Sequence, residues 1–154
     1  AEIVISDREL DFWAGPISQR YLLDMTLHRP DLEKLLEWDR EGRVRRVSGT
    51  DRGIPGVVLT EVGGHTPGQM IAMVEGENGP VLLTSDAVHY YDEVERDWPF
   101  LIATDVPEFY EALDVVKELS ETPGVAYVAG HDPLVMDRFA PIDPARPDLG
   151  VRVS

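Results

Sequence analysis

The sequence predicts an α/β protein in which a mixed β-sheet is flanked by helices. Short runs rich in apolar and β-branched residues, such as residues 57–62 and 70–74, are typical of strands. A segment that begins at Asp105 instead repeats apolar residues at helical spacing. The 154 residues, of which 43% are hydrophobic, suffice for one domain with a buried core.

Two helices and two short strands are predicted before the central sheet. Residues 2–6 form a strand, and Ser6 with the glutamate three positions later is a capping box for a helix over residues 7–13. Leucines spaced three and four apart place a second helix at residues 30–38. The basic run 43–47 alternates as an edge strand does, with its arginines facing solvent or acidic neighbours.

Three strands between residues 57 and 83 form the predicted core sheet. They are joined by a glycine-flanked turn around His65 and by a hairpin signal at residues 77–80. Residues 88–104 contain aromatic side chains with little periodicity, which predicts a loop. These aromatic side chains could line an apolar acyl pocket, or they could cover an edge of the core.

The last third of the chain is predicted to add a long helix and one further strand of the sheet. Asp105 and Glu108 start the helix, and its apolar stripe consists of Phe109, Leu113, Val116 and Leu119. A strand over residues 125–131 and a short helix over residues 133–139 follow. The proline-rich tail is irregular, with a final strand at residues 151–153.

Three of the predicted strands end in residues of the types that bind metal ions. His65 follows the first strand of the core sheet, Asp86 follows the third, and His131 ends the last strand of that sheet. Imidazole and carboxylate groups bind zinc and similar divalent ions, and strand ends are rigid enough to bring distant ligands together. The sequence contains no cysteine, so nitrogen and oxygen atoms must provide any metal site.

Three short motifs resemble those of a known family. Gly64-His65-Thr66-Pro67-Gly68, Ser85-Asp86-Ala87 and Gly130-His131-Asp132 are similar, in this order, to motifs of the metallo-β-lactamase-fold hydrolases, most nearly the N-acyl homoserine lactonases. The resemblance implies part of an αββα sandwich. The family's N-terminal His-x-His-x-Asp-His signature does not occur in the sequence, so residues 1–154 are expected to be the C-terminal portion of a single such domain.

The resemblance implies a quorum-quenching hydrolase that opens lactones by attack of a hydroxide held between two zinc ions. Asp86 matches the carboxylate that bridges the ions, while His65 and His131 match one ligand of each. The other ligands belong to the absent signature, so the chain is expected to need an N-terminal half or a partner chain, and alone to bind metal weakly and lack activity. A non-catalytic fragment or binding module with a partial metal site, and a thioester hydrolase of the glyoxalase II type, remain alternatives.

Two residues near Asp86 are candidates for contacting substrate. The lactonase relatives often have a tyrosine three residues after the bridging aspartate, where this sequence has His89, and Tyr90 comes next. Either side chain could donate a hydrogen bond to a substrate oxygen, so both are candidate catalytic residues together with Asp86. Asp132 could orient a ligand imidazole or could only stabilise its turn.

The charge balance limits the partners that are expected. With 14 basic and 29 acidic residues the net charge is −15, which argues against nucleic acid and anionic membranes. No apolar run approaches the ~20 residues of a membrane span and no N-terminal signal is visible, so a cytoplasmic location is expected. A small lactone or ester substrate fits best. Apolar residues bared by an absent half-sandwich would favour association, which leaves a homo-oligomer open.

Overall fold

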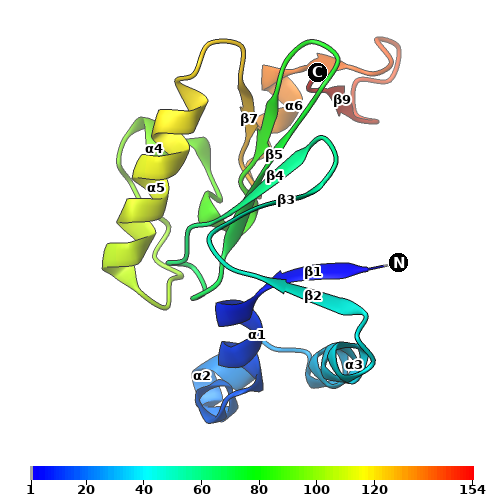
Figure 1. Cartoon of the computed structure of the whole chain (residues 1–154). Helices are drawn as coiled ribbons and strands as arrows, with labels where there is room; N and C mark the ends of the chain where they lie inside the picture. The colour runs from blue at the N-terminus through cyan, green and yellow to red at the C-terminus, as the bar shows by residue number, and fades with distance from the viewer. Residues whose placement is uncertain (1) are drawn as a thin grey trace.

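A five-stranded mixed sheet lies at the centre of the computed structural model, which describes residues 2–154 (Figure 1). The strand order is β3-β4-β5-β6-β7, with β6 and β7 parallel and the other neighbours antiparallel. The five strands are β3 (Thr50–Ile54), β4 (Val57–Glu61), β5 (Met70–Val74), β6 (Val81–Leu83) and β7 (Ala126–Val128). The predicted mixed sheet with flanking helices is confirmed.

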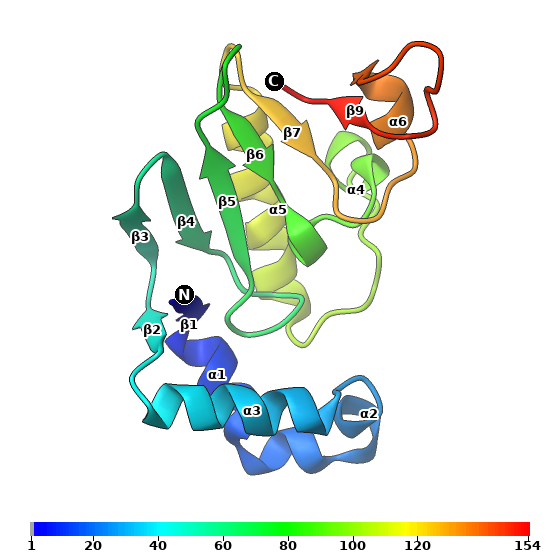
Figure 2. The same cartoon turned by 90° about the vertical axis from the view of Figure 1, so that its right-hand side faces the viewer.

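One face of this sheet is covered by the long helix α5 (Val106–Ser120), as Figure 2 shows. The helix begins as the sequence predicts, because the Asp105 side chain accepts a hydrogen bond of 3.0 Å from the Glu108 backbone nitrogen. Its apolar stripe meets side chains that point toward it from the strands. The resulting core contains Ile71, Leu82, Ala87, Val88, Tyr91, Phe109, Leu113, Val116 and Ala129.

The opposite face of the sheet also carries apolar side chains. Leu59, Ala72, Leu83 and Val128 are successive partners across β4, β5, β6 and β7, so they form one row on the side away from α5. Leu83 is exposed. In Figure 2 this face is turned toward the viewer, and no helix of residues 2–154 lies in front of it.

A separate layer at the N-terminal end contains a two-stranded parallel sheet and several helices. Strand β1 (Ile3–Ser6) pairs with β2 (Val44–Val47), so the predicted edge strand belongs to this sheet and not to the central one. Arg45 binds Asp51 and Glu2, which agrees with the acidic neighbours predicted for this run. The hydrogen bond from Arg45 holds the pKa of Asp51 below its ordinary value. The other elements are α1 (Asp7–Ala14), η1 (Pro16–Gln19), α2 (Tyr21–Asp24) and α3 (Arg29–Arg40).

The segment predicted as a loop over residues 88–104 contains a short helix, α4 (Tyr91–Glu95), so that part of the prediction is wrong. Its five residues are too few to show helical periodicity, and tertiary contacts hold it. The Asp132 carboxylate accepts a hydrogen bond of 2.9 Å from the backbone nitrogen of Tyr91, whose side chain is buried. The chain ends with α6 (Val135–Arg138) and the antiparallel pair β8 (Ala140–Pro141) and β9 (Val151–Arg152).

None of the helices formed by residues 2–154 combines the length and the apolar character needed to cross a membrane.

Candidate metal centre

The topology of the sheet brings the predicted ligands to one end. Strands β4, β6 and β7 run in the same direction, because β4 and β6 are both antiparallel to β5 and β7 is parallel to β6. His65, Asp86 and His131 each lie a few residues beyond the carboxyl end of one of these strands. Ligands far apart in the sequence therefore meet at a single edge.

The turn between β4 and β5 holds His65 in a fixed orientation. Gly63 and Gly64 have φ angles of 69° and 84°, a region that favours glycine. The His65 Nδ1 atom lies 2.7 Å from the carbonyl oxygen of Ile102, so Nδ1 donates a hydrogen bond, which in the neutral imidazole leaves the lone pair on Nε2. Nε2 is 3.8 Å from Oδ2 of Asp86.

Two acidic side chains from different helices hold this turn. The Glu108 carboxylate of α5 accepts a hydrogen bond of 3.1 Å from the Gly64 backbone nitrogen. The Glu9 carboxylate of α1 accepts one of 3.0 Å from the Gly68 backbone nitrogen. Arg8 lies 2.8 Å from Glu108 and links the two helices. The N-terminal layer therefore helps to position His65.

The close packing of the turn predicts a large cost for a methyl group at Gly64. An added Cβ would overlap the backbone of Phe109, whereas Gly124 has a nearly identical φ of 85° and no atom within 4 Å of an added Cβ. Gly124→Ala should therefore lower the free energy of unfolding by about 1 kcal/mol through backbone strain alone. Gly64→Ala should lower it by about 3 kcal/mol, because overlap adds to strain.

Urea unfolding of both variants at one temperature measures this difference. Equal losses for Gly64→Ala and Gly124→Ala would show that the turn can move away from α5 without cost.

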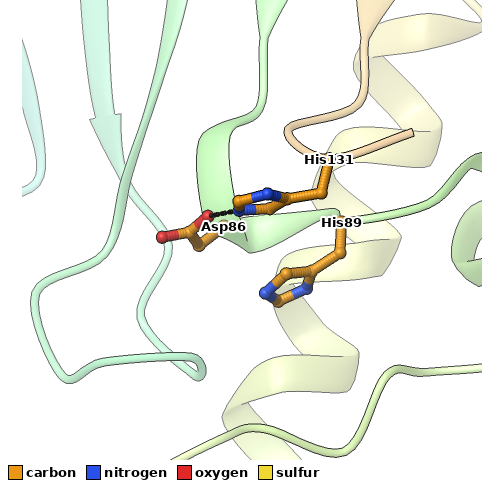
Figure 3. A group of neighbouring side chains, drawn as sticks. All are labelled: Asp86, His89 and His131. Atoms are coloured by element: carbon orange, nitrogen blue, oxygen red, sulfur yellow. Dashed lines mark hydrogen bonds and ion pairs between the residues drawn. The ribbon is translucent and has the colours of Figure 1, made fainter. Parts of the chain in front are cut away.

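Asp86 lies between two histidines. It belongs to the 3₁₀ turn η2 (Ser85–Ala87) directly after β6, and its Oδ1 is 2.7 Å from Nε2 of His131 (Figure 3). Its other oxygen, Oδ2, faces His65. Gly130 permits this approach, since an added Cβ there would overlap the Ser85 carbonyl group. The structure therefore brings His65, Asp86 and His131 together.

The donor atoms of these residues suit a divalent cation. The lone pair on Nε2 of His65 faces a carboxylate oxygen, and two acceptors directed at one another are satisfied by a cation placed between them. Two imidazoles and a carboxylate form a ligand set typical of zinc. The single carboxylate offers one oxygen to each histidine, as a bridge between two ions would.

His89, one of the two candidate substrate contacts, lies inside the site. Its side chain is buried, its ring is 5.0 Å from that of His65, and it stacks at 5.4 Å on His131. Donor atoms of Asp86, His89 and His131 all lie within 4.8 Å of one another. The sequence places His89 three residues after Asp86 but does not show that the ring turns inward.

Glu93 is a buried carboxylate beside the site. Burial by itself raises its pKa, but the neighbouring His89 and backbone N–H groups of Phe100 and Tyr90 stabilise the charged form, so the pKa lies below its ordinary value. Glu93 was not among the residues predicted for the site. Its position three residues after Tyr90 at a helix start was an available signal.

Tyr90 and Asp132 have distinct places around the centre. Tyr90 is partly exposed, packs edge-on against Phe100 at 5.5 Å, and lines a cavity of about 280 Å³ together with His65 and Asp86. The Asp132 carboxylate accepts hydrogen bonds of 2.9 Å from the backbone nitrogens of Tyr91 and Leu134. Of the two roles predicted for Asp132, these contacts favour the one that stabilises the turn.

A larger cavity of about 750 Å³ adjoins His65 and Asp86. Its wall is mainly apolar and combines α2 with the segment after α4. The apolar lining residues are Trp13, Leu22, Leu23, Leu101, Ile102 and Ala103. Two roles were left open for the aromatic side chains of residues 88–104, lining an acyl pocket or covering an edge of the core. None of these aromatic side chains lines this cavity, to which the segment contributes residues 101–104 instead. Helix α2, which was not predicted from the sequence, forms another part of the wall.

Comparison with known proteins gives a partial match to one family. A curated N-acyl homoserine lactonase from Bacillus sp. is 36% identical over 126 residues, which cover 79% of this chain and 44% of that protein. No protein-family model matches the chain. The chain thus spans less than half the length of this relative.

Solved structures of lactonases also match this chain over about half of their own length. An N-acyl homoserine lactone hydrolase with the product N-hexanoyl-L-homoserine bound at its catalytic metal centre has a TM-score of 0.73 and 21% identity, covering 91% of this chain and 50% of that one. A dizinc quorum-quenching lactonase with the same product has a TM-score of 0.64 and 21% identity, covering 86% of this chain and 48% of that one. The chain has the fold of the metallo-β-lactamase-type lactonases over about half of their length, as its motifs predicted.

Proposed function

We propose that this chain is the C-terminal portion of a single metallo-β-lactamase-like domain, which when complete is a zinc-dependent hydrolase that opens lactones such as N-acyl homoserine lactones. The observation that carries the proposal is the position of Asp86. One of its oxygens faces His65 and the other faces His131, beside an apolar cavity of about 750 Å³. A relative with this activity in its name shares 36% of the aligned residues.

In this proposal the chain supplies three zinc ligands, namely His65, Asp86 and His131. Bound zinc ions would supply Lewis acidity and would lower the pKa of a water molecule. The apolar cavity suits an acyl chain, because it places a hydrophobic wall next to the carboxylate. Tyr90 is the better candidate for donating a hydrogen bond to a lactone oxygen, since its side chain is partly exposed while that of His89 is buried.

The ligand count supports a contribution from outside the chain. Zinc usually takes four donors, and three residues cannot complete two ions. The open face of the sheet agrees with this view, because its row of Leu59, Ala72, Leu83 and Val128 suits a second sheet packed against it.

The proposal is tested by assaying the chain with and without a family-type N-terminal segment that carries His-x-His-x-Asp-His. After folding and zinc content are verified, ring opening of N-hexanoyl homoserine lactone and hydrolysis of a thioester are measured in parallel. We expect the completed protein to open the lactone and the isolated chain to lack activity.

Two results would contradict the proposal. Thioester hydrolysis without lactone hydrolysis by the completed protein would show that the substrate class is wrong. Turnover of the lactone by the isolated chain would show that no other segment is required.

A further inference from the structure

The proposed function assigns no role to His89, although its side chain is the least exposed of the three imidazoles around Asp86. The exposed fraction is 7% for His89, 17% for His65 and 58% for His131. The His89 ring lies 5.0 Å from that of Phe100 and stacks on that of His131 with an angle of 20° between the planes. A polar ring held this tightly inside a site has lost water and needs a polar partner.

Glu93 determines which nitrogen of His89 carries the proton. Its Oε1 accepts hydrogen bonds of 2.6 and 2.7 Å from the backbone nitrogens of His89 and Tyr90, and its Oε2 accepts one of 3.0 Å from Phe100. Nδ1 of His89 is 3.6 Å from Oε1 and is the one buried side-chain polar atom in the described part of the chain without a hydrogen-bond partner. A carboxylate beside Nδ1 favours a proton there, so Nε2 keeps its lone pair.

The free nitrogen of His89 faces the other two donors. In Figure 3 the ring lies beneath the Asp86–His131 pair, and its nitrogen farther from the backbone points to the side on which Asp86 lies. One donor atom from each of Asp86, His89 and His131 lies within 4.8 Å of the others. A small shift of the side chains would bring three donors to the ~2.0–2.2 Å distances of a zinc ion.

We infer that His89 is a metal ligand, and that Asp86, His89 and His131 bind one divalent transition-metal cation within this chain. The inference rests on the proposed function for the role of Asp86 and His131, and it adds a ligand from a position at which the related lactonases often have tyrosine. Two imidazoles and one carboxylate bind zinc and other first-row divalent ions, and they leave coordination positions open. Glu93 is then the outer carboxylate that orients a ligand imidazole.

Zinc titration of the isolated chain by calorimetry, without substrate, tests this inference. The wild type is compared with His89→Gln, His65→Gln and the control His28→Gln. His28 is a suitable control because it is an exposed histidine, far from the site in the sequence, that is paired with Asp31. We expect about one zinc ion per wild-type chain, at least about tenfold weaker binding for His89→Gln, and less than about threefold change for the control His28→Gln.

The opposite pattern would overturn the inference. If His65→Gln weakened zinc binding while His89→Gln did not, the cation would use His65 in place of His89, and the proposed lactonase function would be unaffected. Absence of zinc binding by the folded wild type would also overturn it. Failure of the lactone assay alone would count only against the proposed function, because the titration uses no substrate.

A measurement on the wild-type protein tests the inference even if His89→Gln does not fold. Nitrogen NMR of the imidazole groups reports the protonation and metal binding of each ring atom. For His89 we expect a proton on Nδ1 and a change of the Nε2 resonance when zinc is added. An unchanged His89 Nε2 resonance at saturating zinc would exclude His89 as a ligand.

Discussion

Asp86→Asn is expected to lower the zinc affinity of the chain by at least about a hundredfold, and to lower kcat/KM of the completed protein by roughly two to three orders of magnitude. The carboxylate presents one oxygen to His131 at 2.7 Å and the other to His65 at 3.8 Å. An amide keeps only one of these oxygens and replaces the other with an NH₂ group, which cannot bind a cation. Its neutral charge also removes the main electrostatic attraction for the metal.

Zinc titration and lactone assays of the same preparations measure both effects. Asp114→Asn is a matched control, because Asp114 is an exposed residue of α5 and its replacement changes the net charge by the same amount. Wild-type zinc affinity in Asp86→Asn would show that Asp86 is not a ligand. Loss of affinity in both variants would instead point to a general effect of charge.

The position of the site could be predicted from the sequence because the signal for each ligand lies within one short segment. Each of His65, Asp86 and His131 follows an apolar run that is long enough to form a strand, and strands of one direction share an end. The α5 start was predictable for the same reason, since Asp105 and Glu108 are only three residues apart.

The features that could not be predicted from the sequence depend on contacts between distant segments. Helix α4 forms where the Asp132 carboxylate binds the Tyr91 backbone and where Glu93 binds the backbone at Phe100. Strand β1 pairs with β2 although about forty residues separate them, from Ile3 to Val44. The alternation of residues 43–47 predicts a strand but does not identify its partner, because that pairing joins segments far apart in the sequence.

The buried position of His89 likewise depends on contacts that its own short segment does not reveal. Spacing alone shows that this residue lies three positions after Asp86, and either a surface contact or a ligand fits that spacing. Its inward orientation depends on Glu93 from α4 and on Phe100 from the following segment. The sequence could therefore name His89 as a candidate for the site but could not show that its ring points inward.

Phe109→Ala is expected to lower the free energy of unfolding by about 3–5 kcal/mol, the largest loss of stability that we predict for a single side chain. Phe109 is completely buried in the core with Ile71 and Leu82, so its removal leaves a cavity between α5 and the sheet. Tyr110→Ala is the matched control, because the neighbouring ring is exposed and should contribute less than about 1 kcal/mol. Urea unfolding without zinc measures both values.

This substitution should also weaken the candidate metal centre, because the first turn of α5 both packs on the core and holds the His65 turn. Phe109 packs against Gly64, and its neighbour Glu108 binds the Gly64 backbone nitrogen. Loosening of α5 would therefore free His65 to move away from Asp86. In Phe109→Ala we expect increased backbone amide exchange at Gly64 and His65, whereas Tyr110→Ala should leave it unchanged. Full destabilisation without any change at these two amides would show that the turn is held by its hydrogen bonds to Glu108 and Glu9 alone, independently of the core beneath it.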